Sequence, residues 1–171
     1  MVTRHTLPRN RLAQALAVTA IALLVGAAGV AVAGATGPVL VVEDIETGEH
    51  YITQPVDDGT TVALEYTHSV EKTPVYDEYR VEGDTLVNTR MEFESYGWGL
   101  PSRVNVTNVN GTFVYDPSEP ITTLEELSVS PGRIANHTLI VADQQYDLVA
   151  ETNATDVRIH IEHRTLTDVL I

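Results

Sequence analysis

The segment HSVEKTPVYDEY, residues 68–79, is the densest group of reactive side chains in the chain. It combines one His, one Ser, two Glu, one Asp, one Lys and two Tyr around Pro74. Side chains of these types act as nucleophiles, as general bases or as cation ligands. The segment therefore has three candidate roles: a catalytic site, a cation site, or a polar turn. Such a turn either binds a ligand or has polar groups that only hydrogen-bond one another.

Strand periodicity argues against a hydrolase in this segment. Neighbouring residues on a strand point to opposite faces, so His68 is badly placed to activate Ser69. The chain also lacks a G-x-S-x-G nucleophile elbow. We therefore expect no catalytic residue and no enzymatic activity. His68 is then either a hydrogen-bonded histidine at the end of an apolar face or a binding residue.

A cation site in this segment would use His68, Glu71 and Glu78, with Asp77 close by. A set so rich in oxygen favours calcium over zinc. No EF-hand loop or other metal-specific spacing accompanies it. We expect no cofactor, and we keep calcium or another divalent cation, in a binding protein or an exported cation-dependent enzyme, as the alternative.

A second group of residues, FESYGWGLPS, covers positions 93–102. Gly97 and Gly99 flank the single tryptophan and permit positive φ angles or a close approach of the backbone. Tyr96 and Trp98 offer faces for stacking, and exposed backbone N–H groups offer an anion site. The alternative is a loop in which Trp98 only covers one end of the fold.

The elements that must position these groups have the period of strands. Short segments rich in Val, Ile, Thr and Tyr alternate with turn residues, which predicts an all-β, antiparallel β-sandwich or partly open barrel. One short helix is expected at TTLEELS, residues 122–128. The predicted strands are 38–44, 50–54, 60–70, 74–83, 85–95, 112–116, 138–143, 146–151 and 157–163.

The first group is predicted to form a hairpin corner. One strand ends at Val70, the loop EKTP follows, and Pro74 takes the first position of the next strand because it cannot donate a ladder hydrogen bond. Alternation then continues one inward face onto His68, from Val62, Leu64 and Tyr66. On the second strand, Val75, Asp77, Tyr79 and Val81 share one face, and Tyr76, Glu78 and Arg80 share the other.

The first 36 residues form a basic leader followed by an apolar run, and residues 37–171 form the all-β domain. Residues 12–34 are long enough to cross a bilayer as an uncleaved signal anchor. The alternative is a signal peptide cleaved after the small residues Ala31–Ala33. The basic flank favours a single-pass membrane protein whose C-terminal domain is extracytoplasmic; cleavage would give a secreted domain.

Charge and composition exclude several classes of protein. The net charge is −14, all 24 acidic residues follow the leader, and Lys72 is the only lysine. Scattered carboxylates with so little lysine are typical of halophilic surfaces, where high salt screens self-repulsion. Nucleic acid is not an expected partner, since no basic stripe is present. The chain has no cysteine, so disulfides and thiolate metal sites are excluded.

Four N-x-T sequons fit an exported domain. They make the domain a candidate glycoprotein. The acceptor asparagines are Asn105, Asn110, Asn136 and Asn153.

Together the two groups resemble the domain-of-unknown-function 1850 family. The first matches a pattern of the form H-S-V-E-x-T-P-V, and the second matches an S-Y-G-x-G-L-P loop, with Trp98 where a small residue is usual. The resemblance extends over roughly residues 38–150. The matching positions are His68, Ser69, Val70, Glu71, Thr73, Pro74, Val75, Ser95, Tyr96, Gly97, Gly99, Leu100 and Pro101, followed less regularly by Glu78 and Tyr79.

What the resemblance implies is an accessory role. Such domains occur beside, or joined to, membrane subunits of TAXI-type tripartite ATP-independent transporters. The expected partners are a transporter membrane subunit or its solute-binding protein. A cell-surface structural module is a further alternative. The binding surface expected from both groups comprises His68, Ser69, Glu71, Glu78, Tyr79, Tyr96, Gly97 and Gly99.

Overall fold

The computed structural model of the protein describes residues 36–95, 105–117, 120 and 122–165. The chain divides into two compact units, Met1–Gly37 with Arg164–Ile171, and Pro38–His163. The fold below is that of the second unit. The predicted leader helix lies outside the described residues. Within the described ranges, the structure contains no helix with the length and hydrophobicity that a membrane crossing requires.

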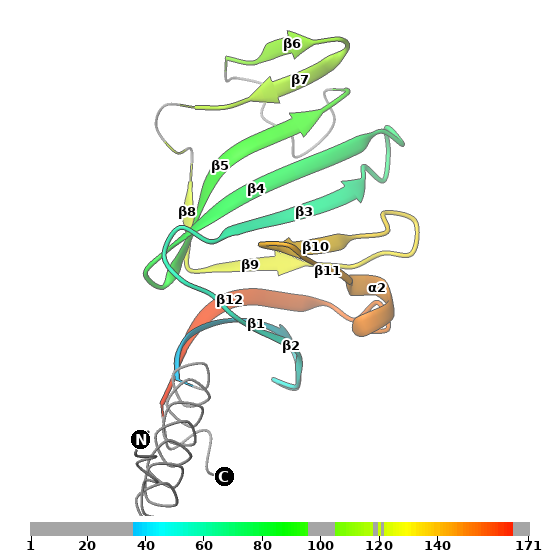
Figure 1. Ribbon diagram of the computed structural model, residues 1–171. Helices are drawn as coiled ribbons and strands as arrows, with labels where there is room; N and C mark the ends of the chain where they lie inside the picture. Colours follow the sequence, from blue (N-terminus) through cyan, green and yellow to red (C-terminus); the bar gives the residue numbers. More distant parts are fainter. Residues whose placement is uncertain (1–35, 96–104, 118–119, 121, 166–171) are drawn as a thin grey trace, which may run out of the picture. The chain divides into compact units, whose positions relative to one another are not determined.

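Two mostly antiparallel sheets, rather than a closed barrel, make up the second unit (Figure 1). This confirms the predicted all-β class. The smaller sheet has the order β2-β1-β12-β9, with strands β1 (Gly37–Asp44), β2 (His50–Pro55), β9 (Glu126–Val129) and β12 (Val157–Arg164). The larger sheet has the order β11-β10-β3-β4-β5-β7-β6, with β8 also paired to β5. Its strands are β3 (Thr61–Thr67), β4 (Pro74–Glu82), β5 (Thr85–Phe93), β6 (Thr107–Val109), β7 (Thr112–Tyr115), β8 (Thr123–Leu124), β10 (Thr138–Val141) and β11 (Gln144–Asp147).

The two sheets share one hydrophobic core, to which strands such as β4 and β12 contribute every second side chain. On β12, Val157, Ile159 and Ile161 are buried, as their alternation predicts. They pack in a cluster with residues of the larger sheet. Phe93 and Val75 form a second, smaller core farther along the larger sheet.

The β3–β4 hairpin confirms the predicted alternation. Val62 and Leu64 are buried and Tyr66 is half-buried, while Pro74 is the first residue of β4. The predicted end of the first strand was wrong: β3 ends at Thr67 instead of Val70. The chain turns at His68, whose N–H donates to the Thr73 carbonyl at 2.8 Å, so the loop takes six residues.

The predicted helix at 122–128 was wrong. These residues contribute to β8 and β9, because pairing with β5 and β12 outweighs local capping signals in so short a segment. The one described helix is α2 (Leu148–Glu151), capped by the Asp147 carboxylate, which accepts from Ala150 N–H at 3.0 Å. The predicted strand 146–151 was therefore wrong for most of its length: only Tyr146 and Asp147 belong to β11, and the other four residues form α2.

Candidate binding site at one end of the larger sheet

The loop between β3 and β4 is closed by hydrogen bonds around His68. Besides the bond to Thr73, the His68 carbonyl accepts from Lys72 N–H at 2.9 Å. Lys72 adopts a left-handed φ of 58°, and its ammonium group donates to the Ser69 carbonyl at 2.5 Å. The six residues 68–73 thus form a defined turn, here called the motif loop.

The His68 ring has a structural role in the motif loop. It is buried, and its Nδ1 accepts from the N–H groups of Val70 at 3.3 Å and Glu71 at 3.1 Å. A neutral ring that accepts at Nδ1 carries its proton on Nε2. Because Nδ1 is occupied by two backbone donors, it is unavailable to a cation. Ser69 and Glu71 are exposed.

The two sequence groups meet at the end of this loop. The Thr73 hydroxyl lies 3.0 Å from the Ser95 hydroxyl, a hydrogen-bonding distance between the first group and the start of the second. The predicted binding residues Tyr96, Gly97 and Gly99 lie outside the described residues.

Glu78 lies on another face from His68. Its carboxylate accepts from the Tyr76 hydroxyl at 3.0 Å and from the Thr89 hydroxyl at 2.8 Å, on the outer face of the larger sheet. Burial and this carboxylate raise the pKa of Tyr76 to about 12. Among the described residues, no group of three or more His, Asp or Glu side chains is arranged to hold a metal ion. His68, Glu71 and Glu78 therefore do not form the cation site that the sequence offered as an alternative.

Buried Asp77 and half-buried Tyr66 form a polar pair near the motif loop. The Tyr66 hydroxyl donates to Asp77 Oδ2 at 3.1 Å, while Asp77 Oδ1 has no partner among the described residues. Burial raises the pKa of Asp77 to about 6, and the Tyr66 hydrogen bond acts in the opposite direction. Burial also raises the pKa of Tyr66 and that of Tyr79, a predicted site residue that belongs instead to the core.

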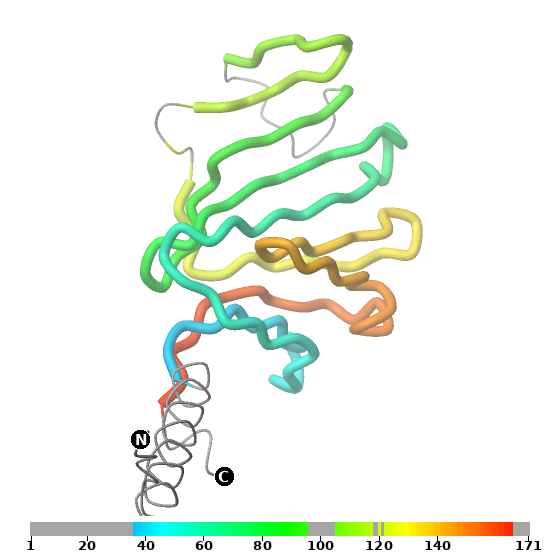
Figure 2. Tube along the Cα trace, viewed as in Figure 1, coloured from blue at the N-terminus to red at the C-terminus, as the bar shows by residue number. Residues whose placement is uncertain are grey.

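A second loop, residues 130–137, approaches the motif loop from β9 and β10. Figure 2 shows both loops at the same end of the larger sheet. Thr67 N–H donates to the Ala135 carbonyl at 2.7 Å, and the His137 ring stacks on Tyr66 with centroids 4.9 Å apart. Burial lowers the pKa of His137.

Between these two loops lies a cavity of about 650 Å³, here called the His68 cavity. None of its described lining residues is acidic. Its lining includes Tyr66, His68, Ser69, Arg133, Ile134 and His137.

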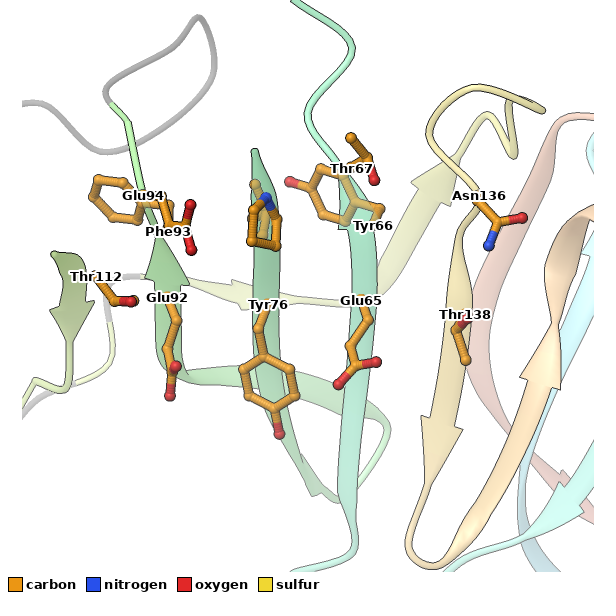
Figure 3. Close-up of a pocket in the computed structure, with 12 residues that line it drawn as sticks. Glu65, Tyr66, Thr67, Tyr76, Glu92, Phe93, Glu94, Thr112, Asn136 and Thr138 are labelled. Carbon is orange, nitrogen blue, oxygen red and sulfur yellow. The ribbon is translucent and has the colours of Figure 1, made fainter. Parts of the chain in front are cut away.

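A cavity of about 450 Å³, here called the outer-face cavity, opens on the same sheet and also involves Tyr66 (Figure 3). Across three neighbouring strands, Glu65, Tyr76 and Glu92 face it in one row, because their register pairs them directly. Glu94 adds a third carboxylate. The two cavities therefore have opposite chemical character although they share one end of the sheet.

Comparison with known proteins identifies the family. A family model described as a domain of unknown function, DUF1850, matches residues 62–148, just over half of the chain. The chain belongs to the DUF1850 family. Searches of curated proteins and of solved structures gave no match. The DUF1850 match includes every described residue that lines the two cavities, whereas β1, β2 and β12 lie outside it.

Sequence reasoning missed several residues of this site within the DUF1850 match. The alternation on β4 had already placed Asp77 on the inner face, so its burial was predictable. No periodicity or motif in the sequence indicated that Arg133 and His137 belong to the site. They reach the motif loop only because β10 pairs with β3, for example Leu139 with Leu64.

The four sequon asparagines lie on the surface. Each is exposed, and Asn110, Asn136 and Asn153 occupy left-handed turn positions. An enzyme that attaches a glycan needs such accessible loop positions. Glycosylation remains a prediction.

Proposed function

We propose that the chain is an accessory domain that acts by binding and assists a TAXI-type tripartite solute importer. The observation that carries the proposal is the motif loop: the residues that define the family resemblance form a hydrogen-bonded turn on the rim of the His68 cavity. Loops held by a rigid sheet are common sites of recognition. The transporter as partner follows from the family resemblance.

The proposed working surface combines the motif loop with the segment that follows β5. The hydrogen bond between Thr73 and Ser95 supports this arrangement, since it ties the start of the second sequence group to the first. The finer architecture that we propose is a sandwich whose loop end faces the partner.

The proposed location is the outer side of a membrane, with residues 12–34 as a single-pass anchor, or the exterior after cleavage of the leader. The exposed positions of the four sequon asparagines support an exported domain. We propose neither a catalytic residue nor a cofactor. The cation-dependent alternative gains no support from His68, because its Nδ1 is held by Val70 and Glu71 N–H groups.

Affinity purification tests the partner. The full chain, tagged at its C-terminus, is expressed in its native host, treated with a crosslinker and purified from membranes in high salt. We expect a transporter membrane subunit or a solute-binding protein among the crosslinked products. Purification of the intact, membrane-associated chain without either subunit would overturn the proposed partner.

A further inference from the structure

Arg133 is a cation without a carboxylate partner among the described residues. Other arginines of the domain are paired: Arg80 with Glu82 at 2.6 Å, Arg90 with Glu92 at 2.7 Å, and Arg158 with Glu43. Arg133 makes no ion pair with any described residue, although the chain carries 24 acidic side chains. Arg133 is among the residues that line the His68 cavity.

No described carboxylate near Arg133 in the His68 cavity neutralises its charge. No acidic residue is among the described residues that line the cavity, whereas Glu65, Glu92 and Glu94 line the neighbouring outer-face cavity. In a chain with a net charge of −14, a cavity lining with an arginine and no described carboxylate differs from the general surface. The single lysine, Lys72, lies in the adjoining motif loop.

Apolar side chains accompany this cationic lining. Ile134, beside Arg133, is 71% exposed and lines the cavity. Val70, beside the lining residue Ser69, is 66% exposed. Ile134 therefore gives the cavity an apolar contact surface beside its arginine. The volume of about 650 Å³ is that of a small-molecule site.

We propose that the His68 cavity binds a small organic carboxylate that carries a hydrocarbon chain. Arg133 receives the carboxylate, since a guanidinium matches its two oxygens in a bidentate geometry. Ser69 and Ser130, which also line the cavity, supply hydroxyl donors, and Ile134 contacts the hydrocarbon part. The inference rests on the proposed binding role and adds the class of ligand.

Calorimetric titration of the full chain in detergent tests this assignment. The probes are butyrate and hexanoate, with butyramide as the neutral match, at constant high salt. We expect both carboxylates to bind and butyramide not to bind. Arg133→Gln should weaken carboxylate binding at least about tenfold, as the loss of one charge-assisted contact does. Ile134→Ser should weaken hexanoate more than butyrate.

Arg80→Gln is the matched control, because Arg80 is an exposed arginine on the outer face of the same sheet, paired with Glu82. The inference is overturned if the folded chain binds neither carboxylate, if butyramide binds as tightly, or if the two arginine variants behave alike. These results are separable from the partner test. Carboxylate binding without a crosslinked transporter subunit would overturn only the proposed partner. A crosslinked subunit without carboxylate binding would overturn only the proposed ligand.

Discussion

Asp77 has an environment unlike that of an ordinary surface carboxyl. It is 8% exposed on a strand that pairs on both sides, and Tyr66 supplies its one hydrogen bond among the described residues. Its pKa of about 6 lies above the ordinary value of 3.8. Between these two values, the folded state binds more protons than the unfolded state. Stability contributed by Asp77 is therefore full below about pH 4 and is lost as the pH rises through about 6.

Asp77→Asn removes this dependence. As the pH rises from about 4 to about 7, the free energy of unfolding of the variant should gain about 2 kcal/mol relative to the wild type. Chemical denaturation at several pH values in constant salt measures the difference. Glu71→Gln, an exposed change in the motif loop, serves as control and should follow the wild type. Parallel curves for Asp77→Asn and the wild type would contradict the assigned pKa.

Tyr66→Phe tests the other half of the pair. The change leaves Asp77 without a described hydrogen-bond partner and should cost about 1–3 kcal/mol of unfolding free energy. The cost should be larger above pH 6, because the hydroxyl stabilises the ionised carboxylate and its loss raises the pKa of Asp77 further.

Tyr76→Phe is the matched comparison for this change. It removes a hydroxyl from Glu78, which keeps the Thr89 hydroxyl as a donor, so the cost in stability should be smaller. Equal costs for the two tyrosines, with no dependence on pH, would show that the Tyr66–Asp77 bond contributes nothing specific.

At the scale of elements, the β3–β4 hairpin was the most predictable part of the site. Alternation placed His68 inward and Ser69 outward, and the missing N–H of Pro74 fixed where β4 begins. The strand end was missed because a ring nitrogen, rather than a strand partner, satisfies the N–H groups of Val70 and Glu71. Side-chain acceptors of this kind leave no periodic signal in the sequence.

His68→Ala should therefore destabilise the fold. The change removes a buried ring and leaves the Val70 and Glu71 N–H groups without their acceptor, which should cost about 2 kcal/mol of unfolding free energy. Glu71→Ala, in the same loop but exposed, should stay within about 0.5 kcal/mol of the wild type. Thermal and chemical denaturation in high salt compare the two. Equal stabilities would contradict a structural role for His68.

At the scale of the whole molecule, the all-β class was predictable and the arrangement of strands was not. Short segments rich in Val and Ile predict strands from local sequence alone. The pairing of β10 with β3 joins residues far apart in the sequence, and local patterns do not indicate it. That pairing brings Arg133 and His137 to the motif loop. The distribution of charge on the surface also depends on strand pairing: the β3–β4–β5 registers put Glu65 and Glu92 in one row, and the β10–β3 pairing brings Arg133 to a cavity without described carboxylates.

Salt should stabilise the protein as a whole. With a net charge of −14, the folded chain repels itself, and added salt shortens the range of that repulsion. We expect the free energy of unfolding to rise by at least about 1 kcal/mol from low to high potassium chloride, with most of the gain below about 1 M, where the Debye length reaches about 3 Å. A constant or falling stability over this range would contradict the halophilic interpretation.

We propose that the motif-loop end of the larger sheet is the surface that binds the transporter partner. Photo-crosslinking from a single position tests it most directly, with the photoreactive residue placed at Ser69 in the motif loop or at Asp84 in the β4–β5 turn at the other end of β4. In membranes of the native host at high salt, we predict that position 69 captures a transporter membrane subunit or solute-binding protein and that position 84 does not. Capture from both positions alike, or from position 84 alone, would rule out this binding surface, as would no capture from position 69 by a chain shown to be folded.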